Sequence, residues 1–442
     1  MNREKSNRMP AFDSGLERLS TVDKALPVTA EHTTAAEFLA TQPRLSAFTT
    51  PVMTLDDSAI DQNLAAMASW CAAHGVELAP HGKTTMAPAV WARQLDAGAT
   101  AITLAMSHQV RVAVHFGIRR IQLANALIDP VALRWLVTAM ADLPDLDVTV
   151  WADSPQTIDA MLAALDGISV SRPIPVLVEL GAPGGRTGAR SIAEAEAVAA
   201  RIAAADALRL AGVCGYEGAL AHDRTEASLA RVRGYLEDMA QLHRRLEAQH
   251  LYPEDGDIVV SAGGSAYFDL VAAVLAPLAG ERVHVVIRAG ASVIHDDGFY
   301  TGITPLQPGT DGNGSDGGDP AYRLRSAMHV WARVVSRPEP GLALLDAGKR
   351  DLPFDEGLPT PQLVAEQLGS PATPLVGGRI TAVNDQHAFL TIPPDCDLRV
   401  GNVVRLGLSH PCTAFDKWRW IPLVADDSSD DPAVIDLIRT YF

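Results

Sequence analysis

The sequence predicts an α/β fold in which a (β/α)8 TIM-type barrel precedes a C-terminal all-β domain. From about residue 77, short β-rich apolar runs alternate with Ala- and Leu-rich segments of helical period, the pattern of repeated βα units around a parallel sheet. Eight units within about 220 residues fit a closed barrel, whose usual length is about 250 residues. An open doubly wound sheet is the alternative. The predicted strands span residues 77–83, 101–105, 121–125, 147–153, 175–180, 210–216, 257–264 and 283–290.

Composition predicts the domain boundaries. Residues 51–306 contain the βα units and form the predicted barrel domain, whereas residues 307–320 are rich in Gly, Asp and Ser and form a predicted linker. Residues 321–442 contain short β-rich runs separated by turn residues, which predicts the all-β domain. Residues 1–50 lack a core of their own, so we expect them to pack on that β domain.

Charge and the lack of long apolar runs exclude several classes of protein. Thirty-six basic and 53 acidic residues give a formal net charge of -17, which repels phosphate backbones and anionic lipid, so we expect no nucleic-acid or membrane partner. No apolar run of signal-peptide length follows the start, and no stretch reaches the roughly 18 apolar residues of a spanning helix. Four scattered cysteines suit reduced thiols or a metal ligand. We therefore expect a cytoplasmic protein.

The first predicted strand ends in PHGKTT, where Lys83 is the candidate nucleophile. Catalytic residues of a parallel barrel collect at the C-terminal ends of the strands, so this position places Lys83 at the barrel mouth. A partly desolvated amine there can have its pKa lowered enough to act as nucleophile and base. A surface lysine in a βα loop is the alternative for this motif taken alone.

Turns after the last two predicted strands are candidates for phosphate binding. SAGGSAYF follows the seventh strand, and its consecutive glycines let backbone N–H groups approach an anion at the start of the next helix. The eighth strand ends in Arg288, Ala289 and Gly290, and the HDDGFY that follows places Tyr300 on the same rim. An ordinary helix cap is the alternative. The candidates after the seventh strand are Ser261, Gly263, Gly264 and Ser265.

Two further loops can bring polar side chains to the mouth. Arg186 follows the fifth strand in GAPGGRTG, where it could hydrogen-bond a phenolate or carboxylate. Tyr216 and Glu217 follow the sixth strand in GYEGALAH, where a ring nitrogen or a substrate group could be met. A surface arginine and a structural tyrosine are the alternatives.

The C-terminal domain contains a candidate metal site in SHPC. On an extended segment, His410 and Cys412 point to the same side and can share one ion. Imidazole with thiolate suits zinc, and two protein ligands leave positions open for water or substrate. A His and a Cys in a buried turn are the alternative. NDQHAFL adds Asp385 and His387 as possible second-shell or acid–base groups, although His387 suits a core histidine equally well.

Together, PHGKTT, the arginine after strand five, GGS after strand seven and HPC resemble the fold-type III pyridoxal-phosphate enzymes over most of residues 50 to 420. More narrowly, they resemble the group of D-serine dehydratases and D-threonine aldolases. The resemblance implies an alanine-racemase-like barrel, a head-to-tail homodimer and Lys83 as the Schiff-base lysine. It also implies Arg186 near the cofactor's phenolic oxygen and Tyr216 near its ring nitrogen. The implied phosphate and zinc residues are Gly263, Gly264 and Ser265, and His410 and Cys412, respectively.

The resemblance implies a metal-assisted lyase that removes water from a D-3-hydroxy amino acid, giving a 2-oxo acid and ammonia. The aldolases tend to have His-x-Asp where this chain has His-x-Cys, and the cysteine favours the dehydratase. Aldol cleavage to glycine and an aldehyde, racemisation and non-catalytic cofactor binding are the alternatives. Zinc is the expected metal, with manganese or magnesium as alternatives.

Overall fold

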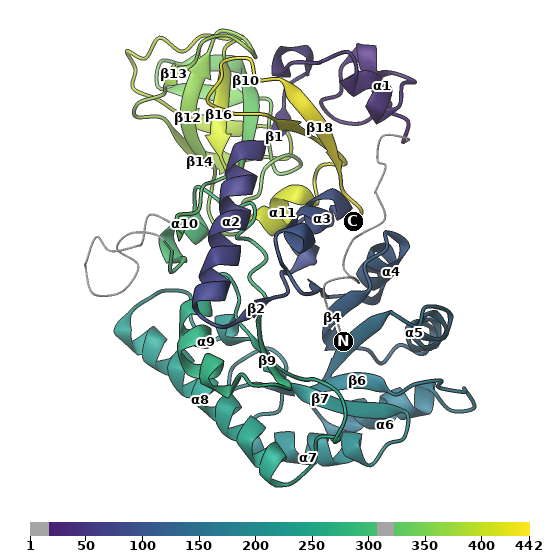
Figure 1. Cartoon of the computed structure of the whole chain (residues 1–442). Coiled ribbons are helices and arrows are strands. Elements are labelled where there is room, and N and C mark those ends of the chain that lie inside the picture. The colour runs from purple at the N-terminus through teal and green to yellow at the C-terminus, as the bar shows by residue number, and fades with distance from the viewer. Residues whose placement is uncertain (1–16, 307–321) are drawn as a thin grey trace.

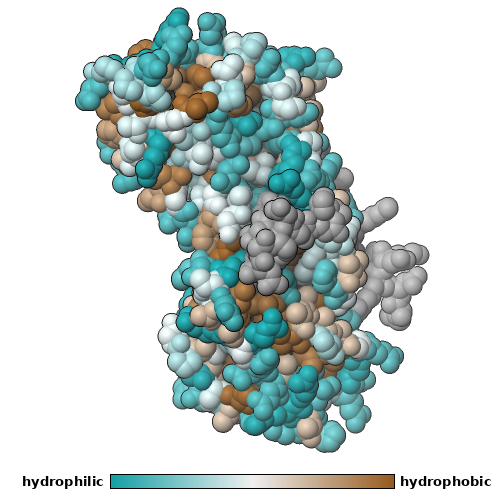
Figure 2. Space-filling model, turned by 90° about the vertical axis from the view of Figure 1, so that its left-hand side faces the viewer, coloured by the Kyte–Doolittle hydropathy of each residue, from teal (hydrophilic) through white to brown (hydrophobic). Residues whose placement is uncertain are grey.

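The computed structural model describes residues 17–306 and 322–442, which form two lobes (Figure 1). One lobe contains the eight parallel strands, and the other contains the antiparallel strands. Figure 2 shows a constriction between the lobes on the face in view. The predicted fold class, a (β/α)8 barrel with an all-β domain, is confirmed.

The eight predicted barrel strands all form, and their sheet curls until its edges meet. The strand order is β2-β9-β8-β7-β6-β5-β4-β3. The N–H groups of Thr100 and Thr103 donate to the carbonyls of Leu78 (2.8 Å) and Pro80 (2.9 Å), which joins the two edges. The alternative of an open sheet is therefore wrong. The strands are β2 (Glu77–Leu78), β3 (Ile102–Leu104), β4 (Arg120–Ala126), β5 (Asp147–Ala152), β6 (Ile174–Leu180), β7 (Leu208–Gly215), β8 (Ile258–Ala262) and β9 (Val283–Ile287).

One helix follows each strand from β2 to β8. Ser154, Ser191 and Thr225 cap the N-termini of α6, α7 and α8 by accepting a backbone N–H, which satisfies one of the free donors of the first turn. Buried aliphatic side chains of these helices pack against the strands to form the barrel core. The helices are α3 (Pro88–Asp96), α4 (Ser107–His115), α5 (Pro130–Asp142), α6 (Pro155–Ala164), α7 (Ile192–Ala203), α8 (Glu226–Ala248) and α9 (Phe268–Leu275).

The second lobe is a ten-stranded, mainly antiparallel sheet. Its main order is β13-β12-β16-β10-β1-β17-β18, and β11, β14 and β15 extend it from β10. The strands are β10 (Met328–Glu339), β11 (Leu342–Leu345), β12 (Thr360–Ala365), β13 (Thr373–Pro374), β14 (Arg379–Val383), β15 (Ala388–Thr391), β16 (Val403–Gly407), β17 (Trp420–Val424) and β18 (Val434–Arg439).

The strand β1 (Val52–Asp56) belongs to the second lobe. It pairs antiparallel with β10 and parallel with β17, so the barrel boundary predicted at residue 51 is too early. The helix α2 (Asp57–Ala73) then leads from this sheet to the barrel (Figure 1). An apolar run followed directly by a helix looks like a barrel unit, because the sequence does not show which strand is its partner.

The described part of the N-terminal segment, residues 17–50, packs on the β domain. Phe38 of α1 (Ala35–Leu39) and Phe48 lie in the same apolar core as the β-domain strands, and the N–H of Leu45 donates to Pro432. The linker predicted at 307–320 lies outside the described residues. Within the described residues, no helix has the length and apolarity needed to cross a membrane.

Candidate active site

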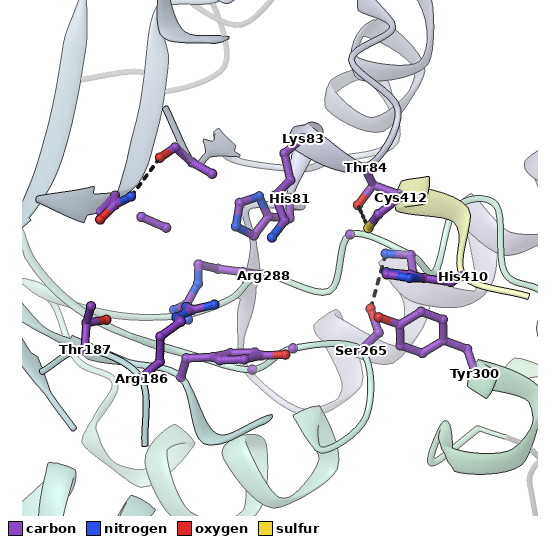
Figure 3. Close-up of a pocket in the computed structure, with 18 of the residues that line it drawn as sticks. His81, Lys83, Thr84, Arg186, Thr187, Ser265, Arg288, Tyr300, His410 and Cys412 are labelled. Carbon is purple, nitrogen blue, oxygen red and sulfur yellow. Dashed lines mark hydrogen bonds between the residues drawn. The ribbon is translucent and has the colours of Figure 1, made fainter. Parts of the chain in front are cut away.

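A cavity of about 330 Å³ lies at the C-terminal ends of the barrel strands, where the β domain contributes part of its wall (Figure 3). The described residues that line it include two arginines and a lysine but no aspartate or glutamate. Such a cavity favours an anionic ligand. The predicted site residues that line it are Lys83, Arg186, Tyr216, Gly263, Gly264, Ser265, Arg288, Gly290, His410 and Cys412.

Lys83 lies in the 3-10 helix η5 (Gly82–Thr84), just beyond β2. The indole of Trp91 donates to the carbonyl of Gly82 at 3.0 Å, and a Cβ on Gly82 would lie 2.7 Å from Ile102 and Trp91. This close packing allows only glycine there, and it fixes the backbone that carries Lys83. The amine therefore extends into the cavity from a rigid support (Figure 3).

His81, two residues before Lys83, also lines the cavity and was not singled out from the sequence. Its Nδ1 is buried and has no hydrogen-bond partner among the described residues. Burial, followed by the charges of Lys83, Arg288 and Arg186, holds the pKa of His81 well below its usual value. The imidazole is therefore neutral at physiological pH.

Arg288 is buried beneath the cavity. Its Nη1 donates to the Ser261 hydroxyl at 2.7 Å and its Nη2 to the Gly215 carbonyl at 2.6 Å, while its guanidinium lies 4.9 Å from the Trp151 ring. Burial lowers the pKa of Arg288. Ser261 does not line the cavity, so the structure places it as a support for Arg288 rather than as a direct cofactor contact.

The predicted phosphate-binding turn after β8 already has an anion bound to it. The Gly263 and Gly264 N–H groups donate to the fully buried Glu217 carboxylate, at 2.9 Å and 2.7 Å. These two amides therefore do not face an incoming phosphate in this structure. Ser265 accepts the Ala291 N–H at 3.2 Å, so its own hydroxyl proton is left to donate to a ligand.

The loops after β6 and β7 bring Arg186 and Tyr216 together. The Arg186 guanidinium lies 5.0 Å from the centre of the Tyr216 ring, and cation and ring attract at this separation. Arg190 fixes the first loop because its guanidinium donates to carbonyls of Ala182 and Arg186. Burial raises the pKa of Tyr216. Both predicted residues thus lie on one wall of the cavity.

His410 and Cys412 form the β-domain side of the cavity. They flank the start of α11 (Pro411–Phe415), and His410 has a left-handed backbone with φ 52°. The extended arrangement expected from the sequence is therefore wrong, and a turn brings the two side chains together. Positive φ in a non-glycine residue stores strain that the surroundings must support.

Hydrogen bonds fix this pair. The Asp355 carboxylate contacts His410 Nδ1 at 2.6 Å and accepts from the Thr413 hydroxyl at 2.6 Å, and Thr84 lies 3.3 Å from the Cys412 sulfur. Although burial opposes it, interaction with Cys412 raises the pKa of His410 to about 9. Burial raises the pKa of Cys412, but the bond to His410 outweighs it and leaves the pKa below its usual value.

These donors fit a divalent metal ion. Asp355 binds one ring nitrogen of His410 and leaves the other for an ion, the arrangement that orients ligating histidines. The pKa of the Cys412 thiol lies below its usual value, which favours the thiolate, the metal-binding form. Among the described residues, the three side chains close enough together to hold an ion are Asp56, Asp426 and Asp427, which lie elsewhere in the molecule. His410 and Cys412 therefore have no third possible protein ligand grouped with them in the part of the chain that the structure describes. An ion at His410 and Cys412 would therefore keep open positions.

His387 does not reach the cavity. It lies with Asp385 in the exposed turn between β14 and β15, where the Asn384 N–H donates to the His387 carbonyl at 2.8 Å. Residue type alone suggested the catalytic role, but the tight hairpin holds the histidine on the surface. The position gives no support to a catalytic role within this chain.

Two family models match the chain. Residues 55–272 match the family described as alanine racemase, N-terminal domain, and residues 327–424 match the putative serine dehydratase domain. The chain belongs to the fold-type III pyridoxal-phosphate enzymes. The predicted resemblance is thereby confirmed.

Similar proteins narrow the class within this family. The chain is 28% identical over 387 residues to D-threonine aldolase from Arthrobacter sp, which covers 86% of this chain and 90% of that protein. It is 27% identical over 316 residues to 3-hydroxy-D-aspartate aldolase from Paracoccus denitrificans (strain Pd 1222), with 70% of this chain and 74% of that protein covered. This family member is a pyridoxal-phosphate-dependent lyase.

Solved structures share the whole architecture. D-threonine aldolase from Filomicrobium marinum has a TM-score of 0.73 and 25% identity, covering 90% of this chain and 96% of that chain. D-threo-3-hydroxyaspartate dehydratase from Delftia sp. HT23 has a TM-score of 0.68 and 22% identity, covering 90% of this chain and 99% of that chain. The pairing of barrel and β domain is therefore common to these enzymes.

Proposed function

We propose that the protein is a metal-assisted D-3-hydroxy amino acid dehydratase that forms a 2-oxo acid and ammonia, with D-serine as the type of substrate. The observation that carries this proposal is that Lys83 and the His410–Cys412 pair line one cavity in which the described lining residues include no carboxylate. Cleavage of the aldol type needs a base for the β-hydroxyl proton, and with no carboxylate on the described wall the candidate is the neutral imidazole of His81. Elimination needs only a base at Cα and an acceptor for the departing oxygen.

Pyridoxal phosphate, when bound, supplies an electron sink for the Cα of an attached amino acid. The residues present fit this group. Lys83 provides the amine, and Ser265 provides a donor beside Gly290. A Cβ on Gly290 would lie 2.6 Å from the His81 backbone oxygen, so there is no room for a side chain at this position of the cavity wall. Arg186 is placed to hydrogen-bond an anionic ring oxygen.

A divalent metal, with zinc as the best match to imidazole and thiolate, would supply Lewis acidity. His410 and Cys412 would hold it, and Asp355 would keep His410 oriented. Lys83 removes the α-proton while the β-oxygen leaves with its bonding electrons. The unsaturated amine that results takes up water and releases ammonia, so D-serine gives pyruvate and ammonium without any external oxidant.

Aldol cleavage is the second candidate, since two of the relatives described above are aldolases at 27% and 28% identity. Their substrates, D-threonine and 3-hydroxy-D-aspartate, are also D-3-hydroxy amino acids. Both candidates use Lys83 and the metal pair. They differ only in whether the C–O or the Cα–Cβ bond breaks.

Product analysis separates the two reactions. Purified protein loaded with pyridoxal phosphate and zinc is incubated with D-serine and D-threonine, and 2-oxo acid, ammonia and glycine are measured. The proposal expects 2-oxo acid and ammonia in equal amounts from D-isomers only, lost on treatment with chelator and in Lys83→Ala. Glycine as the main product would replace the dehydratase by an aldolase.

A homodimer in the cytoplasm is part of the same proposal. It is supported by exposed apolar side chains near the starts of α4 and α5, on the cavity side of the barrel. Met106, Ile128 and Val131 are 52%, 51% and 72% exposed. A molar mass of one chain at micromolar concentration would contradict the dimer.

A further inference from the structure

Tyr300 lies where the barrel meets the β domain. It belongs to α10 (Phe299–Ile303), beyond the last barrel strand, and its ring lines the cavity beside His410, with the ring centres 6.5 Å apart. Figure 3 shows its ring pointing from the β-domain side toward the cavity. Within residues 17–306 and 322–442, no hydrogen bond to its hydroxyl is formed. The hydroxyl is therefore free to bind a ligand.

One carboxylate holds Tyr300 and His410 in a fixed relation. Asp296 is fully buried. Its Oδ1 accepts the N–H groups of Gly298 (3.1 Å), Tyr300 (2.9 Å) and Thr301 (3.3 Å), and its Oδ2 accepts the N–H of His410 (2.9 Å). Segments more than 100 residues apart are thus anchored on a single side chain.

Further contacts join the same two segments. The Asp297 N–H donates to Leu408 at 2.9 Å, and the Phe299 N–H donates to the Ser409 hydroxyl at 3.2 Å. A Cβ on Gly298 would lie 2.7 Å from the Ser409 side chain, so glycine leaves the room that this serine occupies. The position of Tyr300 relative to the metal-binding pair is therefore built into the fold.

We propose that Tyr300 is a catalytic residue whose hydroxyl donates a hydrogen bond to the β-oxygen of the substrate, and that Asp296 is the residue that positions it. This inference rests on the proposed dehydratase function. A phenol keeps its proton at neutral pH because its ordinary pKa is about 10. A donor fixed where charge develops on a departing oxygen stabilises the transition state without reorganisation. The same donor opposes loss of the β-hydroxyl proton, so it favours elimination over aldol cleavage.

The test compares two reactions of one active site. The substrate D-serine has a β-oxygen, whereas D-alanine has none but can still exchange its α-proton with deuterated solvent through Lys83. Both rates are measured for wild type and for Tyr300→Phe, loaded with pyridoxal phosphate and zinc. We expect 2-oxo acid formation from D-serine to fall about 100-fold in the variant, while α-proton exchange of D-alanine changes less than about threefold.

Tyr252→Phe is the matched control, because the Tyr252 hydroxyl contacts His243 at 3.1 Å, outside the cavity. It should change neither rate. Asp296→Asn replaces the acceptor for the His410 N–H by an amide group, and should lower both 2-oxo acid formation and zinc affinity, measured by chelator competition. Thermal unfolding of each unloaded variant shows whether it has folded.

Three results would overturn the inference. Equal loss of both rates in Tyr300→Phe would mean that the hydroxyl supports the site as a whole. A weaker affinity for pyridoxal phosphate with an unchanged rate ratio would place the hydroxyl on the cofactor's phosphate. A wild type that exchanges the α-proton of D-alanine but forms no 2-oxo acid from D-serine would refute the dehydratase itself, and the role of Tyr300 with it.

Discussion

Replacing Glu217 by glutamine measures how strongly a buried carboxylate holds the turn after β8. Glu217 is fully buried, and its two oxygens accept the Gly263 and Gly264 N–H groups. Glutamine keeps one acceptor and puts an NH2 group against the other N–H. An unsatisfied buried donor costs about 1–3 kcal/mol, and the introduced amide leaves two donors facing each other. We therefore expect the free energy of unfolding to fall by about 2–4 kcal/mol.

Urea unfolding of the unloaded protein, followed by circular dichroism, measures this difference. Glu254→Gln is the control, because Glu254 is exposed in a loop, and exposed substitutions of this kind stay within about 0.5 kcal/mol. The affinity for pyridoxal phosphate should also fall, because the turn carries Ser265. If Glu217→Gln were as stable as the control, the two hydrogen bonds would not hold the turn, and this explanation of the site would be refuted.

Three further predictions concern the metal pair, a buried ion pair and a tight contact between strands. Asp355→Asn should weaken zinc binding about 10- to 100-fold in chelator competition, because Asp355 orients His410; unchanged affinity would exclude this role. The two ring nitrogens of His329 lie 3.3 Å from the Asp297 carboxylate and 3.0 Å from the Asp427 carboxylate. Burial alone would lower the pKa of His329, but these carboxylates outweigh burial and raise the pKa above 6.5. The protonated His329 therefore stabilises the fold fully below pH 6.5, and this contribution is lost as the pH rises through the raised pKa. The difference in unfolding free energy between wild type and His329→Gln should decline from pH 6 to pH 9. A difference that stays constant with pH would contradict the ion pair. Gly212 has φ 141°, and a Cβ there would lie 1.9 Å from the Val259 carbonyl oxygen. Gly212→Ala should therefore lower the unfolding free energy by about 3 kcal/mol or more. A thermal midpoint equal to that of the wild type would show that β7 and β8 can move apart at no cost in stability.

The barrel was predictable because most of its strands are short, largely buried apolar runs and each strand from β2 to β8 is followed by its own helix. Both features are local. β1 has the same local appearance, but its partners β10 and β17 lie more than 270 residues away. The strand β1 is not among the predicted strands, and the predicted barrel domain wrongly includes its residues. Register between distant strands is not a local property.

The candidate site shows the same division. Lys83 and Arg186 could be located because each follows a predicted strand. Asp355 escaped notice because it lies in a loop 55 residues before His410, and nothing in its surroundings distinguishes it from other surface acids. The turn at Gly263 was recognised as an anion site, but the sequence could not show that Glu217 of the same chain occupies it.

The pairing of β1 also sets the order in which the enzyme can be completed. Because β1 precedes the barrel while its neighbours β10 and β17 follow it, the barrel is an insertion within a discontinuous β domain. During synthesis the barrel strands can close first, and β1 waits unpaired until residue 328 and then residue 420 emerge. Domains tend to fold from the N-terminus as they are made. Lys83 is thus in place well before His410 and Cys412, and a ribosome must finish nearly the whole chain before the cavity has both of its walls.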